Sequence, residues 1–296
     1  MHVFAVVCHK ITNPLIYTVR KLSKSKNALV LILFDKKSAD EEFIKLQKEF
    51  LGLENVEFVE RISIDWAKFS LVEGPLLMMS YVENIDYKYF SLISGDDVAI
   101  PKGSDIMDFL DRSYEKHLEF IGFDFASKGL HGPYMRLIID YPNYFYRRKL
   151  NPILKFRKKM SMKFRLRFLK KDISHIPPLY KGSNWFTLSK EAVSYILSYV
   201  RNNPKYVESF KKSFCSDEMF FHTILYNSDF KKNIYGSEGD KKVFSWSMRD
   251  IDWRSGPEFP RIYHEEDFEN IKSRGMLFAR KIDSNTPIDI LEKYFP

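Results

Sequence analysis

Apolar residues in the first half of the chain form short runs that alternate with amphipathic segments. Five of these runs predict strands: Val3–Cys8, Leu29–Phe34, Val56–Val59, Tyr89–Ile93 and Leu118–Gly122. The first two are continuous apolar stretches, which are typical of strands buried on both faces of a parallel sheet. Helix-start patterns lie between the runs, at Asn13-Pro14, Ser38–Glu41 and Ser70–Glu73. Strands that alternate with helices predict an α/β fold, with a mostly parallel sheet covered by helices on both faces.

The second half of the chain has fewer regular patterns. Trp185–Leu188 predicts one more strand, and Ser189 is placed to cap the helix that follows it. Ser216 is a second candidate N-cap, for a helix that would begin at the next residue. The tail from Gly236 to Pro296 is predicted to be rich in loops.

Polar residues follow three of the predicted strands. His9 comes after the first strand, Asp35 after the second, and Asp96-Asp97 after the fourth. Ligands of open α/β sheets bind beyond the carboxyl ends of the strands, so these positions are candidates for a binding site. Each also has a structural interpretation, because Asp35 can simply end a strand and the aspartate pair can form a turn.

Two adjacent carboxylates, Asp217 and Glu218, lie between aromatic segments in the stretch SFCSDEMFFH (Ser213–His222). Acidic residues are rarely buried without a partner. They can complement the dipole of a helix start, or one of them can act as a general base. Successive helical positions point about 100° apart, so both carboxylates cannot readily serve one reaction centre.

The positive charge is concentrated in one segment. Twelve basic residues and no acidic ones occur between Tyr141 and Lys171: Arg147, Arg148, Lys149, Lys155, Arg157, Lys158, Lys159, Lys163, Arg165, Arg167, Lys170 and Lys171. The net charge of the chain is +8, so the rest of the sequence carries about −4. We therefore expect one domain over residues 1–296, with a basic insertion at about 141–175.

The basic insertion also has an apolar period of four. Phe156, Met160, Phe164 and Phe168 would share one face of a helix, with Lys and Arg on the other faces. Such a basic amphipathic helix suits an anionic membrane surface. Nucleic acid is the rival partner, although we do not expect it, and a solvated helix packed against the body is the third interpretation.

Composition sets the class of protein and the expected compartment. The chain has 296 residues, 45% of them hydrophobic, and lacks an apolar stretch of about 18 residues that could span a membrane. Cys8 and Cys215 are not part of a disulfide framework, which favours a reducing cytoplasm. We expect a cytoplasmic protein held peripherally on the inner face of the cell membrane.

Eight segments, in order, resemble the family 14 glycosyltransferases, which are the core-2/I-branching β-1,6-N-acetylglucosaminyltransferases and the protein O-xylosyltransferases. These segments are VVCHK (6–10), FDKKS (34–38), WAKFSLVEGPL (66–76), YFSLISGDDVAI (89–100), GSNWFTLSKEAVSYIL (182–197), SDEMFFHTIL (216–225), RDIDW (249–253) and LFARKID (277–283). The resemblance covers about residues 3–285, apart from the basic insertion. The sequence departs from the family at Phe34, where Val is usual, at Asp96, where Gln or Met is usual, and in the loop after Trp253.

The resemblance implies a GT-A-type nucleotide-sugar-binding fold and inverting transfer from a UDP-sugar without the usual metal. It implies that Glu218 is the general base, and that Asp35 contacts the uracil end of the nucleotide, with Val6 in the same site. A Lys and an Arg would neutralise the diphosphate. Lys281 matches the Lys. For the Arg, Arg249 is favoured over Arg254 and Arg280.

Three further residues are predicted to contact the acceptor or the sugar, namely Trp185, Asp97 and Asp217. Aromatic rings pack against apolar sugar faces, although Trp185 could equally be a core residue. Two basic side chains can replace a metal ion at the diphosphate. Many GT-A enzymes bind a metal ion through an Asp-x-Asp tripeptide. This chain has one at Asp250–Asp252, but it lies near the C-terminus and not after a central strand, so we expect no metal there.

The sequence thus predicts an inverting, metal-independent transferase that moves a sugar from a UDP-sugar, expected to be UDP-N-acetylglucosamine. The acceptor would be a saccharide or a lipid-linked saccharide in surface polysaccharide synthesis. A glycoside hydrolase would need two carboxylates flanking one bond, and only Glu218 is well placed. The alternative is that the protein is not an enzyme but a membrane- or nucleic-acid-binding protein that uses the basic insertion.

Overall fold

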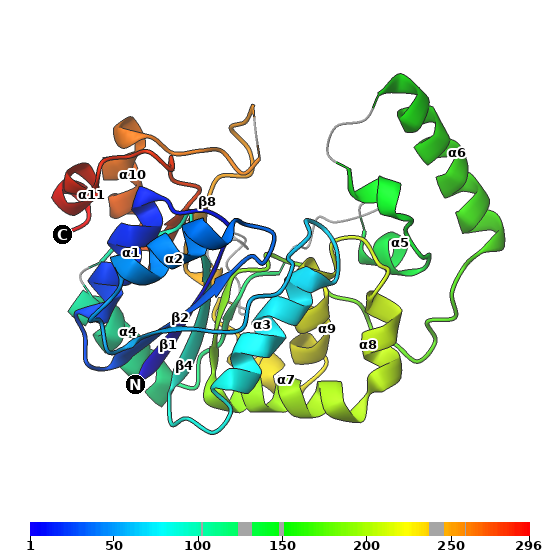
Figure 1. The fold of residues 1–296 in the computed structure, drawn as a ribbon. Helices are drawn as coiled ribbons and strands as arrows, with labels where there is room; N and C mark the ends of the chain where they lie inside the picture. The colour runs from blue at the N-terminus through cyan, green and yellow to red at the C-terminus, as the bar shows by residue number, and fades with distance from the viewer. Residues whose placement is uncertain (102, 124–131, 148–150, 237–245, 258) are drawn as a thin grey trace.

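The central feature of the computed structural model is a six-stranded sheet with the order β3-β2-β1-β4-β7-β6 (Figure 1). The structure describes residues 1–101, 103–123, 132–147, 151–236, 246–257 and 259–296. The strands are β1 (His2–Cys8), β2 (Ala28–Phe34), β3 (Val56–Phe58), β4 (Tyr89–Ser94), β6 (Phe120–Ile121) and β7 (Phe186–Ser189). The first four run parallel, and β7 is antiparallel to both of its neighbours. The predicted mostly parallel α/β sheet is confirmed.

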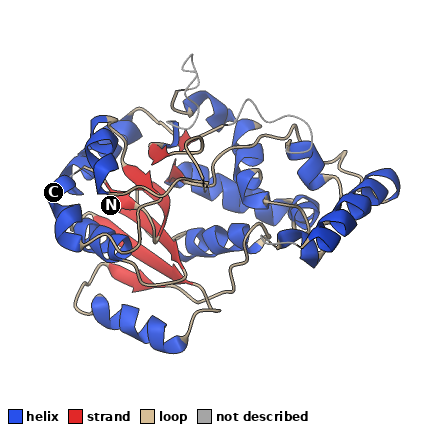
Figure 2. Ribbon diagram, turned by 90° about the horizontal axis from the view of Figure 1, so that it is seen from above, coloured by secondary structure: helices blue, strands red, loops and turns tan. Residues whose placement is uncertain are grey.

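Helices cover both faces of this sheet, as Figures 1 and 2 show. One layer is formed by α1 (Asn13–Ser23), α2 (Asp40–Glu49) and α4 (Gly103–Glu115), and the other by α3 (Ser70–Tyr81), α7 (Lys190–Asn202), α8 (Pro204–Phe210) and α9 (Phe220–Tyr226). Alternate residues of β1 point into the two layers, because side chains of a strand alternate between its faces. Phe4 and Val6 join the core under α1, whereas Val3 and Ala5 join the core under α3 and α7.

The tail is more regular than predicted. A second sheet has the order β5-β9-β8, formed by β5 (Val98–Ala99), β8 (Arg249–Ile251) and β9 (Phe278–Arg280). Between β8 and β9 the chain forms η6 (Glu265–Asp267) and α10 (Phe268–Ser273). The helix α11 (Ile288–Tyr294) follows β9. The tail is still rich in loops, as predicted, but the sequence did not reveal its two strands, because strands of three residues are too short to show alternation.

The basic insertion contains η2 (Asn143–Tyr146) and α6 (Pro152–Phe168), and together with the preceding helix α5 (Pro133–Leu137) it forms a peripheral unit. Figure 1 shows α6 at the edge of the molecule, remote from the sheet. The predicted helix is confirmed, and Arg148 and Lys149 lie outside the described residues. Within the described ranges, no helix is long and apolar enough to cross a membrane.

Three predicted helix starts were wrong in detail. Thr12, not Asn13, caps α1 with its side chain. The Ser38 hydroxyl donates to a backbone carbonyl in the loop after β1, and the Ser70 hydroxyl accepts from the backbone N–H of Asp65. These hydroxyls tie loops together at the carboxyl ends of the strands, where a capping pattern cannot be told from a loop contact.

The start of α7 was predicted correctly and yields a pH dependence. The Ser189 side chain caps α7 and donates to the buried carboxyl of Glu119, as does its backbone N–H. Burial raises the pKa of Glu119 from 4.5 to about 8. The native protein therefore keeps a proton that the unfolded chain loses between these values, so this group's contribution to the free energy of unfolding falls as pH rises from about 4.5 to 8.

We expect Glu119→Gln to flatten this part of the pH dependence, because glutamine does not titrate. Urea unfolding across the same pH window measures it. Glu115→Gln, at an exposed position on α4, is the matched control and should keep the wild-type slope. A wild-type slope in Glu119→Gln would contradict this assignment.

Candidate active site

A cleft opens at the carboxyl ends of β1, β2 and β4. It consists of two adjoining cavities of about 430 Å³ and 340 Å³, which lie in the size range of small-molecule sites. The two cavities share part of their lining: Trp66, Leu71, Trp185, Arg280 and Lys281. We call the larger one the strand-end cavity and the smaller one the Glu218 cavity.

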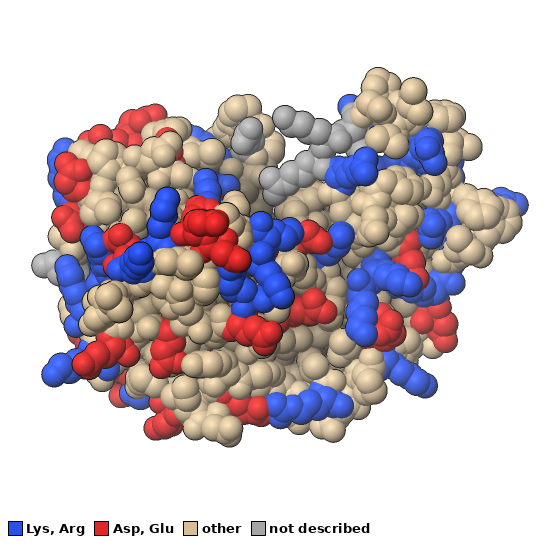
Figure 3. Space-filling view, viewed as in Figure 1, with Lys and Arg blue, Asp and Glu red and all other residues tan. Residues whose placement is uncertain are grey.

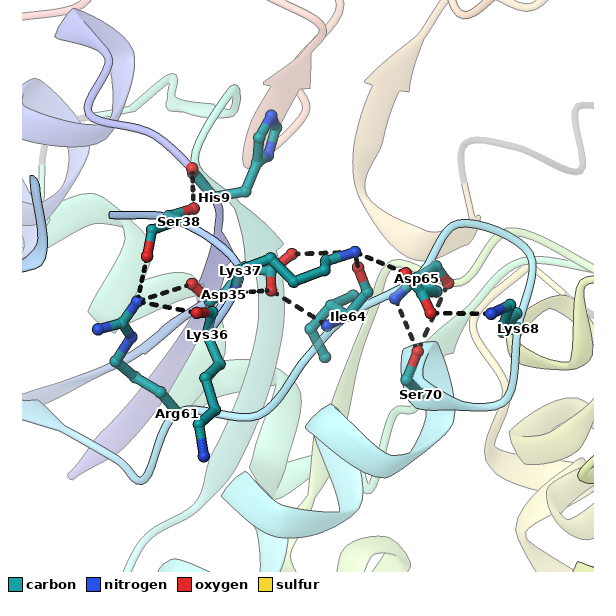
Figure 4. Close-up of polar contacts among 10 residues, drawn as sticks. All are labelled: His9, Asp35, Lys36, Lys37, Ser38, Arg61, Ile64, Asp65, Lys68 and Ser70. Atoms are coloured by element: carbon teal, nitrogen blue, oxygen red, sulfur yellow. Dashed lines mark hydrogen bonds and ion pairs between the residues drawn. The ribbon is translucent and has the colours of Figure 1, made fainter. Parts of the chain in front are cut away.

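The strand-end cavity is lined by residues that follow the strands, as the sequence predicts. His9, Asp35 and Asp96 all contribute to its wall. The Asp35 carboxylate accepts hydrogen bonds from the backbone N–H groups of Lys37 and Ile64, at 2.9 and 3.2 Å (Figure 4). Asp35 is therefore held rigidly at the floor of the cavity by two loops.

Lys37 and Asp65 close one side of this region. The Lys37 ammonium lies 2.6 Å from Asp65 and 3.7 Å from Asp35 (Figure 4). The hydrogen bond with Lys37 lowers the pKa of Asp65. The Asp35 side chain is thus bordered by a cation that also lines the cavity.

Two predicted site residues lie behind the cavity wall and not on it. Val6 is buried under α1, and its neighbour Val7 lines the cavity instead. Asp97 is fully buried and accepts hydrogen bonds from the backbone and the hydroxyl of Ser94. Direct contact of Val6 or Asp97 with a ligand in this cleft is therefore not supported by their placement.

Arg280 and Lys281 lie where the two cavities meet. The Arg280 guanidinium donates to Ser94 at 3.1 Å and stacks over the ring of Trp185, 4.2 Å from its centroid. The Lys281 ammonium lies 3.2 Å from Asp96. Two cations therefore lie at the boundary between the cavities, each beside an aspartate: Arg280 is 3.4 Å from Asp97, and Lys281 is beside Asp96. A guanidinium has the planar fork that suits phosphate oxygens.

The favoured assignment of Arg249 to a phosphate site needs correction. Its side chain is 1% exposed, and its guanidinium donates to backbone carbonyls of Ser247, Leu92 and Phe186. Burial lowers the pKa of Arg249 to about 9. This guanidinium fastens the short sheet to the central one and does not face the cleft, so Arg280 replaces it as the candidate.

The Asp-x-Asp tripeptide is committed to structural contacts. The Asp250 carboxylate pairs with Arg274 at 2.8 Å and accepts from the Tyr263 hydroxyl. Asp252 accepts from the backbone N–H groups of Arg254 and Ser255. The described lining of the two cavities includes neither of these aspartates and does not include Arg254.

Glu218 sits in a short 3-10 turn, η3 (Ser216–Glu218), that precedes α9. The prediction that Ser216 caps a helix was wrong: the turn is preceded by Cys215 in a left-handed conformation, with φ 50°. The turn projects Glu218 into the Glu218 cavity. Its backbone carbonyl accepts from the N–H of Gly182, so the segment GSNWF holds the turn in place.

Two cations that the sequence did not single out flank Glu218. Arg136, at α5, donates to the Glu218 carboxylate at 2.5 Å, and the Lys181 ammonium lies 3.5 Å away. The Arg136 and Lys181 side chains are both 13% exposed, so the cluster is largely shielded from water. Arg136 lies in an unremarkable segment of sequence, and no local pattern could have revealed it.

Asp217 differs from its neighbour in environment. It is 5% exposed and lines the same cavity. Burial raises its pKa, and the charge of Glu218 raises it further. Of the described polar atoms, its Oδ1 is one of the few buried ones without a hydrogen-bond partner. This oxygen is enclosed by protein atoms, and none of the described groups donates a hydrogen bond to it.

Neighbouring atoms leave no room for a side chain at position 182, so this residue has to be glycine. A Cβ at this position would overlap the carbonyl oxygen of Gly122 and lie 2.6 Å from Nε2 of the buried His222. We expect Gly182→Ala to lower the free energy of unfolding by about 2 kcal/mol or more. Gly52→Ala is the control, because it meets no atoms within 4 Å and carries only the strain of a positive φ, about 1 kcal/mol. Chemical denaturation that showed equal losses would contradict this reading.

The outer wall of the Glu218 cavity is aromatic. Trp185 and Trp66 stand between the two cavities, and Trp253 and Phe259 line the far side. Trp253 and Phe259 are 37% and 60% exposed, which leaves their rings available to a ligand. A groove with aromatic walls and a carboxylate at its floor suits a carbohydrate, whose apolar faces pack on rings while its hydroxyls find polar partners.

The protein is an α/β protein whose candidate ligand site lies at the carboxyl ends of its parallel strands. The site has cations at its centre and aromatic side chains at one end. The sequence model of the Core-2/I-Branching enzyme family matches residues 3–272. The chain belongs to this family of glycosyltransferases, and the predicted α/β fold with a mostly parallel sheet is confirmed. No curated protein matches the chain in sequence.

The solved structures that match the chain are only distantly similar to it. The structure of residues 1–349 of S. aureus TarS is 11% identical with a TM-score of 0.37, and the match covers 76% of this chain and 56% of those 349 residues. Mouse xyloside xylosyltransferase 1 is 10% identical with a TM-score of 0.34, covering 76% of this chain and 82% of that one.

Proposed function

We propose that the protein is an inverting glycosyltransferase that moves a sugar from a UDP-sugar, N-acetylglucosamine being the expected sugar, to a saccharide acceptor. The observation that carries the proposal is the arrangement along the cleft. A strand-end cavity of nucleotide size, two cations at its inner end, and a carboxylate in an aromatic groove follow one another in the order that a nucleotide, a diphosphate and a reacting sugar require.

The donor would place its uracil end near Asp35 and its diphosphate between the two cavities. There Arg280 and Lys281 would neutralise the charge that develops on the leaving UDP. Because both cations already converge on that point, the reaction is proposed to need no metal ion. Asp217, which lines the Glu218 cavity, would contact a hydroxyl of the sugar there.

Glu218 would act as the general base. An inverting transfer is one displacement at the anomeric carbon, and the acceptor hydroxyl loses its proton as it attacks. The carboxylate lies in the groove where the aromatic side chains would hold an acceptor. Arg136 and Lys181 would orient the carboxylate, and an arriving acceptor hydroxyl would compete with them for one of its oxygens.

The acceptor is proposed to be a saccharide, lipid-linked in the cell, in the synthesis of a surface polysaccharide. The protein would then work from the cytoplasm, held on the inner face of the cell membrane. The basic, apolar surface of α6 supports this location. A non-catalytic binding protein that uses the same helix is the competing interpretation, but it leaves the cation and carboxylate arrangement of the cleft without a role.

Thermal unfolding against a panel of nucleotides, in EDTA and with added manganese, tests the donor site. Stabilisation by UDP or a UDP-sugar in EDTA is the expected result, because a ligand that binds the native state raises the unfolding temperature. Stabilisation that depends on manganese would retain the transferase but refute the metal-independent site. Absence of stabilisation by every nucleotide, at millimolar concentration, would favour the binding protein.

A further inference from the structure

The helix α6 carries an apolar stripe that faces away from the protein. Its members are 50–71% exposed: Ile153, Phe156, Met160, Phe164 and Phe168. Of the helix residues none is buried. Isolated exposed apolar residues are common, but five on one face of one helix form a continuous patch, which marks an interaction surface. We call this patch the α6 stripe.

The opposite face of α6 fixes this orientation. Met162 and Leu166 pack against the small core of Ile138, Ile139, Tyr141 and Phe145. The Lys158 ammonium donates to the carbonyl of Phe145, and the Arg165 guanidinium to the carbonyl of Asp140. The helix therefore already uses one face to join the body, and the α6 stripe is left over after that packing.

Cations border the α6 stripe. Five basic side chains of the helix are exposed and are not used in packing: Lys155, Arg157, Lys159, Lys163 and Arg167. The helix has no acidic residue. In Figure 3 the region of α6, at the upper right, shows uncharged atoms beside Lys and Arg. Long basic side chains can keep their charge at lipid headgroups while their stems lie on apolar surface.

We propose that α6 docks the protein on an anionic lipid bilayer, with the α6 stripe in the interface between headgroups and acyl chains. A second copy of the chain would bring the same cations face to face, and their repulsion opposes such a dimer. Nucleic acid would satisfy the cations and leave three phenylalanines in water. An anionic bilayer satisfies both features, because its interface takes the apolar face and its headgroups take the charge.

The docking helix is joined to the acceptor half of the cleft. Tyr141, in the small core under α6, contacts the ring of Phe214, which in turn contacts the ring of Trp66 in the cleft wall. The same unit supplies Arg136 to Glu218. If the proposed transferase function is correct, a lipid-linked acceptor would reach the base from the side on which the bilayer lies.

Co-sedimentation of the full chain with vesicles tests the docking surface. Vesicles of phosphatidylcholine with phosphatidylglycerol should bind the protein, and vesicles of phosphatidylcholine alone should bind it far less. The double variant Phe156→Ser/Phe164→Ser should bind the anionic vesicles at least tenfold more weakly. Leu51→Ser, which replaces an 85% exposed leucine remote from α6, is the matched control and should bind as the wild type does.

Circular dichroism and the UDP-induced thermal shift establish that the stripe variant is folded and keeps its donor site. Vesicle binding that is equal in wild type and stripe variant would overturn the proposal. A wild-type dimer in sedimentation analysis that the stripe variant abolishes would also overturn it, in favour of a second copy. Because the thermal shift reads the donor site alone, failure of the docking surface and failure of the transferase function give different results.

Discussion

Replacement of Glu218 by glutamine is expected to reduce sugar transfer by about 10²- to 10⁴-fold, which is the usual contribution of a general base. The amide keeps the size of the side chain and can no longer take a proton. Donor binding should be retained, because Glu218 lies in the second cavity and the nucleotide would lie in the first. Steady-state transfer and UDP binding, measured on the same preparation, separate the two effects.

The control for this variant is Glu41→Gln, at an exposed position on α2, which should leave transfer unchanged. Turnover of Glu218→Gln within a factor of two of wild type would refute the base assignment. Loss of UDP binding together with activity would instead show that the substitution disturbs the whole cleft, since Gly182 is bonded to the backbone of this residue.

Removal of either cation at the junction of the cavities should weaken the binding of UDP. We expect Arg280→Ala and Lys281→Ala each to raise the dissociation constant roughly 10- to 100-fold, because hydrogen bonds to charged groups contribute about 1.5–3 kcal/mol. Calorimetric titration with UDP in EDTA measures it. Arg280→Lys should recover only part of the affinity, since lysine lacks the planar fork and the stacking on Trp185.

Two other arginines serve as comparisons. Arg254→Ala removes an exposed guanidinium outside the lining of both cavities and should leave UDP affinity unchanged. Arg249→Met should lower the unfolding temperature, because three backbone carbonyls lose their donor. Equal loss of UDP affinity in Arg254→Ala and Arg280→Ala would argue against Arg280 as the arginine that contacts the diphosphate.

The contrast between Arg249 and Arg280 shows where the sequence stops being informative. β8 and β9 are parallel neighbours, with Arg249 opposite Phe278 and Ile251 opposite Arg280. Arg249 is the first residue of β8, and its side chain bonds to the central sheet. Arg280 is the last residue of β9, and its side chain lines the cleft. Strands of three residues give no alternation from which the direction of a side chain can be read.

The main sheet, by contrast, followed from local patterns. β1 and β2 are long and apolar throughout, and such runs have few alternatives to a buried parallel strand. From that fold the carboxyl ends of the strands locate the cleft, and Asp35 and Lys281 do line it. Their roles stay predictions.

The surroundings of Glu218 required the tertiary structure. Arg136 is far from Glu218 in the sequence, and their contact depends on how the peripheral unit packs on the body. The outward direction of the α6 stripe has the same origin. The period of four predicts an apolar face, but the residues that pack against the body are Met162 and Leu166, which lie on the opposite face of the helix. Only the folded chain shows which face is left over.

An inverting displacement in this cleft, with Glu218 as the proposed base, fixes the configuration of the new glycosidic bond. Proton NMR of the donor selected by thermal unfolding, incubated with the protein in EDTA and with an acceptor saccharide, observes the configuration of the new bond directly. We expect an α-linked donor to yield a β-linked product, and Glu218→Gln to form it at least a hundredfold more slowly. An α-linked product, or a β-linked product formed equally fast by the variant, would contradict this mechanism.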